Sequence, residues 1–184
     1  MGQLFDALSD RHRHFIAAQQ MFFVGTATAA GRVSVSPKGT DSLRVLDAKR
    51  VVWVNLTGSG NESAAHVHCD PRMTLMFCAF AGDPLILRVY GQARVLHRKD
   101  AEWSALLALF PPQPGARQIF DLAVDSVQTS CGIGVPLYTW NGDRGMLGDW
   151  AQKKGEAGLR QYWQEKNQTS IDGLPTHILD KSGE

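Results

Sequence analysis

Apolar residues in this chain recur mostly at every second position, in short runs separated by glycine, proline or small polar residues. Such alternation is typical of strands with one buried face, and β-branched and aromatic residues dominate the runs. The pattern predicts a mainly β, antiparallel protein. The predicted strands cover residues 21–29, 32–36, 43–46, 51–56, 73–80, 85–97 and 118–129.

Turn residues connect these strands. Ala30 and Gly31 join the first two into a hairpin, and Gly82-Asp83-Pro84 joins the two long strands 73–80 and 85–97. Gly91 lies inside the second long strand, where a glycine is typical of a bulge or of the bend of a barrel. The inventory predicts a six-stranded antiparallel split β-barrel with flanking helices.

Helices are predicted only between or after the strands, at residues 9–20, 61–68, 100–110 and 147–167, and the last contains Gly155 and Gly158. After residue 167 we expect extended chain that wraps the surface. The length of 184 residues favours one domain, 1–184, with the barrel at about 21–136 and a C-terminal helical extension and tail at 137–184.

Composition excludes several functions. Nineteen Lys and Arg against eighteen Asp and Glu give a formal net charge of +1, too little to attract nucleic acid, and no apolar run is long enough for a membrane span. The beginning, MGQLFDALSDRHRHF, has no apolar signal segment. Cys69, Cys78 and Cys131 lie far apart, which predicts neither disulfides nor a zinc site. A cytoplasmic protein is expected.

The histidine pairs are also poor metal ligands. His12 and His14, like His66 and His68, are two residues apart, so the members of a pair do not share a helix face. We therefore predict no metal site and expect these histidines at the surface or at an interface.

The segment VVWVNLTGSGNESAAHV runs a predicted buried strand into a glycine-rich loop and then into a helix. Gly58 and Gly60 allow a ligand to approach the backbone, and hydroxyls and the helix N-terminus favour an anion such as phosphate. An alternative is that Ser59 and Glu62 form only a capping box for the helix.

A second candidate lies in RVSVSPKG, where Pro37 ends the strand and fixes the point at which Lys38 leaves it. The hairpin order brings this lysine near the glycine-rich loop, where an ammonium group could neutralise a phosphate. A lysine beside a turn can equally be only solvated.

The order of VGTATAAGRVSVSPKG, VVWVNLTGSGNESAAHV and RMTLMFCAFAGDPLILRVYGQARVL resembles the pyridoxamine 5'-phosphate oxidase-like family of flavin-binding split barrels, over residues 21–136. SPKG, GSGNES and SCGIGVP are similar to a branch of that family without assigned activities. The resemblance implies a homodimer with FMN at its interface. Of the tryptophans 140, 150 and 163, which could stack on the flavin from the partner chain or could equally belong to the core, Trp150 just after Gly148-Asp149 is the preferred one. The implied cofactor-binding residues are Ser36, Pro37, Lys38, Gly39, Asn55, Thr57, Gly58, Ser59, Gly60, Asn61, Glu62, Ser63 and Trp150.

The resemblance implies an FMN-dependent oxidoreductase acting on a small molecule, in which no side chain is assigned as the catalyst. Two departures argue against pyridoxamine phosphate as the substrate. Only Lys38 is an obvious cation for the phosphate, and SIDGLPTHILDKSGE lacks the basic C-terminal substrate signature. The alternative is a protein that binds flavin, deazaflavin or haem without turnover.

Overall fold

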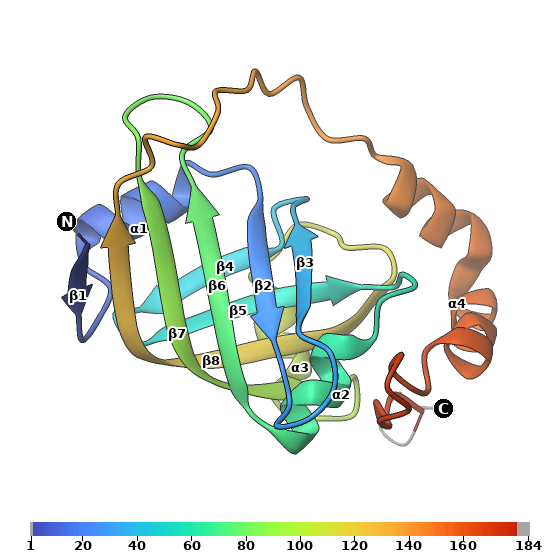
Figure 1. Cartoon of the computed structure of the whole chain (residues 1–184). Helices are drawn as coiled ribbons and strands as arrows, with labels where there is room; N and C mark the ends of the chain where they lie inside the picture. The colour runs from blue at the N-terminus through green and yellow to red at the C-terminus, as the bar shows by residue number, and fades with distance from the viewer. Residues whose placement is uncertain (1, 180–184) are drawn as a thin grey trace.

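Eight strands pair into one curled antiparallel sheet in the computed structural model, which describes residues 2–179 (Figure 1). Residues 180–184 of the predicted tail lie outside the described residues. The strands are β1 (Gln3–Phe5), β2 (Phe22–Thr26), β3 (Ser34–Lys38), β4 (Leu43–Asp47), β5 (Arg50–Leu56), β6 (Arg72–Cys78), β7 (Ile86–Leu96) and β8 (Ala116–Ser130).

The strand order is β3-β2-β6-β7-β8-β5-β4, and β1 adds to β8. The mainly β fold class and all seven predicted strands are confirmed. The sheet has eight strands instead of the six expected for the barrel: all seven strands located from the sequence join it, and β1 adds an eighth, whose three residues are too few to show alternation. Figure 1 shows β4 and β5 crossing behind β2, β3 and β6, so the sheet folds over onto itself.

Gly91 bends the longest pair of strands. The register between β7 and β8 shifts between Tyr90 and Gly91, as the sequence predicts. A Cβ atom at Gly91 would lie 2.1 Å from the carbonyl oxygen of Ala123, so no larger residue fits without moving the backbone. The bend encloses a core in which Trp53 stacks on Phe120 at 4.3 Å between ring centroids.

Four helices flank the sheet: α1 (Asp10–Ala17), α2 (Glu62–Cys69), α3 (Trp103–Leu107) and α4 (Met146–Lys166). Each lies within its predicted region to within one residue, and α3 is six residues shorter than expected. Helix α4 stands beside the barrel and is reached through the extended segment 131–145, defined here as the arm (Figure 1). Gly155 breaks α4 with φ 64° and ψ 175°.

The expectation of surface histidines is wrong for His12 and His66, which are both buried. His66 faces the barrel, where Nδ1 lies 3.1 Å from the hydroxyl of Thr26 on β2. His12 instead closes the start of α1, because its Nδ1 accepts from the backbone N–H of Ser9 at 3.2 Å. Both histidines therefore have structural partners.

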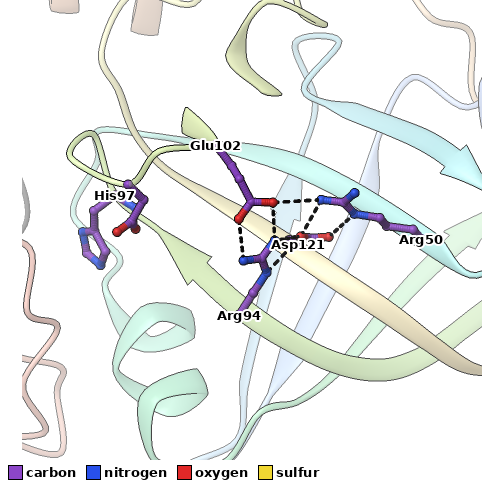
Figure 2. Close-up of polar contacts among 6 residues, drawn as sticks. Arg50, Arg94, His97, Glu102 and Asp121 are labelled. Atoms are coloured by element: carbon purple, nitrogen blue, oxygen red, sulfur yellow. Dashed lines mark hydrogen bonds and ion pairs between the residues drawn. The ribbon is translucent and has the colours of Figure 1, made fainter. Parts of the chain in front are cut away.

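A charged network ties three strands together on the outside of the barrel (Figure 2). Asp121 on β8 is only 6% exposed, and both of its carboxylate oxygens accept hydrogen bonds from Arg50 on β5 at 2.9 Å. Arg94 on β7 binds the same carboxylate at 2.6 Å and Glu102 at 2.7 and 2.8 Å. Two cations and two carboxylates form this group, defined here as the Asp121 network.

Within residues 2–179, no helix is long and apolar enough to cross a membrane. In the same residues, no three His, Cys, Asp or Glu side chains come together as metal ligands.

Candidate cofactor site

Lys38 ends edge strand β3 and turns its ammonium group inward, toward β5. Its Nζ lies 3.3 Å from the side-chain amide of Asn55 and 5.3 Å from the ring centroid of Trp53. Burial is the main cause that lowers the pKa of Lys38 to about 8, and the charge of Arg117 lowers it further, against the attraction of Glu62. The lysine is therefore held in the protein rather than solvated at a turn.

Arg117, at the start of β8, is a second cation; it is buried, with 3% exposed, whereas Lys38 is partly buried. Its guanidinium donates to the carbonyl oxygens of Gly58 and Gly60 and to Oδ1 of Asn61 at 3.2 Å. Burial lowers the pKa of Arg117 to about 10, with attraction from Tyr162 and Glu62 acting the other way. This arginine fixes the shape of the glycine-rich loop through the loop's own carbonyl groups.

Lys38 and Arg117 lack a close carboxylate partner. None of the ion pairs between described residues includes either of them. Among residues 2–179, Glu62 is the only acid with a resolved influence on both pKa values, and its Oε2 accepts from the backbone N–H of Asn61 at 3.0 Å. Since buried charges in proteins are normally paired, the excess positive charge favours an anion at this place.

The glycines of the loop leave room for such a ligand. A Cβ atom at Gly58 would meet no atom within 4 Å, and one at Gly60 would meet only the Glu62 carboxylate at 3.5 Å. Neither glycine has a positive φ angle. The fold itself therefore does not require glycine at either position, which is consistent with close approach of a ligand to the backbone.

Helix α4 and the tail hold the same loop from its other side. Trp163 Nε1 donates to the Thr57 hydroxyl at 2.9 Å, and that hydroxyl donates to the carbonyl of Gly115 at 2.8 Å. The side chain of Asn61 donates to the carbonyl of Lys166 at 2.9 Å. The side chains of Thr57 and Asn61, which the sequence analysis assigned to cofactor binding, thus form hydrogen bonds within the protein that anchor the loop.

The capping-box alternative for the loop is wrong. Asn61, not Ser59, is the N-cap residue of α2, and no side chain caps the helix. The carboxylate of Glu62 binds backbone N–H groups of Asn61 and, at 3.4 Å, of Ile171. The helix start is therefore tied to the tail instead of closed on itself.

Three adjoining cavities run from this loop along the open side of the barrel. The inner cavity, of about 190 Å³, is lined by Lys38, Gly58, Gly60 and Arg117. It shares Lys38 and Leu147 with the central cavity, of about 980 Å³, whose walls include Trp150 and prolines 111, 112 and 114. The outer cavity, of about 570 Å³, adjoins the central one at Gly39, Asp41 and Asp143.

Twelve of the thirteen sequence-predicted residues line these cavities or a pocket beside them. Pro37, Lys38, Gly39, Thr57, Gly58 and Gly60 line the inner cavity, and Trp150 lines the central one. A pocket of about 20 Å³ beside Lys38 is bounded by Ser36, Asn55, Asn61, Glu62 and Ser63. Ser59 is exposed on the loop and lines none of these cavities.

Trp150 lines the central cavity of its own chain, together with Lys38. Its indole ring packs edge-on against Tyr162, 5.2 Å between centroids, and Lys154 lies over it. Trp163, another aromatic residue of α4, is buried and is used for packing and for the hydrogen bond to Thr57. Of these two tryptophans, only Trp150 can meet a ligand in the cavity.

Sequence reasoning missed Arg117 because the residue lies one position before the predicted strand 118–129, next to a proline-rich turn. Only the pairing of β5 with β8 reveals its role. Asn55 pairs with Gln118 and Leu56 with Ala116, so the register shift places Arg117 beside the loop that follows β5. The sequence did contain one signal that could have identified Arg117: it is a cationic residue next to the end of a strand predicted to be buried.

Comparisons with known proteins agree with this architecture. The pyridoxamine 5'-phosphate oxidase profile matches residues 8–131. The pyridoxamine 5'-phosphate oxidase family protein ustO of Aspergillus flavus is 35% identical over 195 aligned positions, which cover 95% of this chain and 78% of ustO.

Two solved structures share the fold, each with a TM-score of 0.54. A variant of HupZ from Group A Streptococcus is 20% identical, over 66% of this chain and 98% of that one. A candidate pyridoxamine 5'-phosphate oxidase from Lactobacillus delbrueckii is 22% identical, over 67% of this chain and 94% of that one. At these identities the likeness concerns the fold alone.

Proposed function

Since the chain belongs to the pyridoxamine 5'-phosphate oxidase family, we propose that it is an FMN-dependent oxidoreductase acting on a small molecule other than pyridoxamine phosphate. Flavin binding is general to this family. The choice of FMN depends on the inner cavity, because a flavin with a terminal phosphate supplies the anion that this site lacks.

The observation that carries the proposal is a pair of cations, partly buried Lys38 and buried Arg117, which both line the inner of three adjoining cavities. Lys38 and Arg117 face a loop whose glycines have open space at their Cβ positions. The central cavity continues from this point, and its volume of about 980 Å³ lies at the upper end of the range for small-molecule sites. The residues present therefore fit a phosphate joined to a large ring system.

Lys38 and the backbone N–H groups of residues 58–63 would hold the phosphate, while Arg117 would keep the loop in shape through the carbonyls of Gly58 and Gly60. Trp150 and the prolines of the central cavity would pack against the ring and exclude water. When bound, FMN supplies hydride or electron transfer, and the chain supplies orientation and a dry environment.

The outer cavity favours an enzyme over a protein that only stores a flavin, a deazaflavin or haem. A storage protein has no need for space beside the ring, whereas an oxidoreductase must admit a second molecule. About 570 Å³ adjoin the central cavity at Gly39 and Asp143, enough for a small substrate. Pyridoxamine phosphate stays an unfavoured substrate, because the C-terminal segment lacks the basic signature.

A homodimer is part of the proposal. Val35 on edge strand β3 is 64% exposed, Val33 just before this strand is 72% exposed, and Leu137, Tyr138 and Trp140 of the arm are all exposed. Exposed apolar residues of this kind favour a protein interface, and a second copy would cover them. Light scattering at micromolar concentration should give twice the mass of the chain, and a monomer would contradict this part.

The visible spectrum of the purified protein tests the cofactor, because FMN, deazaflavin and haem absorb differently. Turnover is tested by anaerobic mixing of the FMN-loaded protein with a nicotinamide nucleotide or another small donor. We expect the flavin absorbance to bleach, to return with an acceptor over many cycles, and to show little response to pyridoxamine phosphate. Bound flavin that stays oxidised while free FMN in the same vessel is reduced would favour the storage function instead.

A further inference from the structure

The outer cavity has both apolar and polar walls, and its lining includes two cations, Arg13 and Arg44. Helix α1 contributes Arg13 and Ile16, the strands contribute Phe22 and Phe77, and the arm contributes Trp140. Ile16, Phe22 and Phe77 are buried members of the core cluster, so one wall of the cavity belongs to the core of the barrel. A ligand in this space would bury an apolar body against these side chains.

Arg13 has a partly buried guanidinium group without a partner in residues 2–179. Its Nε is buried and makes no hydrogen bond, and no ion pair or side-chain hydrogen bond between described residues involves its other nitrogens. An arginine offers five donors in a planar fork that matches a carboxylate. Donors left unsatisfied next to a cavity favour a ligand that accepts from them.

None of the other charged residues that line the cavity forms an ion pair with Arg13 in the described part of the chain. Arg44 is paired with Asp41 through bonds of 2.5 and 2.8 Å and donates to the carbonyl of Leu109, so this pair is neutral and satisfied. Asp143 is exposed on the arm, at the border shared with the central cavity. Arg13 is thus the cation of the outer cavity that is available for an anionic group.

We propose that the outer cavity binds the carboxylate of an apolar organic acid through Arg13, with the body of the acid between Trp140 and the wall to which the stacked rings of Phe22 and Phe77 belong. The proposal of a carboxylate site depends only on the cavity and on Arg13. Its role as the substrate site rests on the proposed function, because only a flavin in the adjoining central cavity would make the acid a substrate.

The first measurement compares benzoate with benzamide, which has almost the same shape without the charge. Each probe is titrated by calorimetry into the full chain without flavin. We expect benzoate to bind at least about tenfold more tightly than benzamide, because a charge-assisted bidentate bond is lost in the amide. Equal affinities, or no binding of either probe, would overturn the carboxylate site.

The second measurement assigns the discrimination to Arg13. Arg13→Gln should lower benzoate affinity to the level of benzamide and leave benzamide unchanged. Arg11→Gln is the matched control, because Arg11 is exposed on the same helix and lines none of the cavities described here. Arg13→Lys keeps the charge without the fork and should bind benzoate with intermediate affinity, provided that thermal melting shows each variant to be folded. Unchanged benzoate affinity in folded Arg13→Gln would overturn the assignment.

A third titration separates this inference from the proposed function. Benzoate is titrated into protein saturated with FMN, and the flavin absorbance is followed. Simultaneous binding with a change in the flavin spectrum would support two adjoining sites. Competition between benzoate and FMN would overturn the inference, since the outer cavity would then belong to the flavin. If the chain binds benzoate but no flavin at all, the carboxylate site stands and the proposed function fails.

Discussion

Strand β8 carries two groups of buried charge that differ in one respect. Asp121 lies near its middle and forms a neutral network with Arg50, Arg94 and Glu102. Arg117 lies at its start, where Glu62 is the one acid of the described part of the chain that acts on the pKa values of both Arg117 and Lys38. The first group is balanced within the protein, and the second group is not.

The pKa values express this difference. Burial acts to raise the pKa of Asp121, but hydrogen bonds and charges from Arg50 and Arg94 outweigh it, so the pKa lies below its ordinary value. For Lys38 nothing outweighs burial, and its pKa falls to about 8. A balanced buried group stabilises the fold, whereas an unbalanced one is destabilising until a ligand completes it.

The largest expected effect concerns stability. Asp121→Asn leaves Arg50 and Arg94 facing each other without their shared carboxylate, so the free energy of unfolding should fall by about 3 kcal/mol. Asp125→Asn is the control, because Asp125 is exposed on the same strand and bonds only Gln92. Urea unfolding measures both variants, and equal losses would show that the network has no special weight.

The opposite result is expected for the unbalanced group. Lys38→Ala removes a partly buried charge that has no ion-pair partner among the described residues, so the stability of the flavin-free protein should stay the same or rise. FMN affinity should fall by about 1 to 3 kcal/mol, the range for a lost charge-assisted hydrogen bond. Riboflavin, without the phosphate, should bind equally to both proteins. Lys153→Ala on the exposed surface of α4 serves as the control. Equal losses for FMN and riboflavin would mean that Lys38 acts through the fold.

The pH dependence of binding should follow Lys38. The ammonium form is available to FMN below about pH 8, so the association constant should fall above that pH, by up to about tenfold per pH unit. The stability of the flavin-free protein changes in the other direction. Between about pH 8 and 10.5 the unfolded lysine keeps a proton that the folded one has lost, so unfolding becomes less favourable as the pH rises. Lys38→Ala should abolish both trends, and profiles that are parallel to the wild type would contradict the assignment.

The smallest expected effect concerns the loop glycines. The Cβ atom that Gly58→Ala adds would have no atom within 4 Å, so the free energy of unfolding should change by no more than about 1 kcal/mol. If the phosphate approaches the backbone here, the affinity for FMN should fall several-fold. Gly115→Ala is the contrasting variant. Its φ is 81° and its Cβ would lie 2.9 Å from that of Ala151, so it should destabilise the protein. Unchanged FMN affinity in Gly58→Ala would place the phosphate away from the loop.

Local patterns identified much of the fold. Alternation located seven strands, and Gly91 indicated the bulge at which β7 bends, because both features depend on residues next to one another in the chain. Lys38 and the glycine-rich loop were also visible, since each directly follows a strand. No local pattern of this kind identifies the substrate, the electron donor or the extent of turnover.

What the sequence by itself determined is therefore the set of strands, the glycine loop and one cation, all written in short stretches of chain. Only the tertiary structure decided that Arg117 binds the carbonyl groups of the loop and that α4 forms hydrogen bonds with Thr57 and Asn61. It also decided that Arg13 lines a cavity beside the core. These facts depend on register and on contacts between residues up to 106 positions apart. The balance of charge at a buried site is a sum over such distant neighbours, and no local pattern contains it.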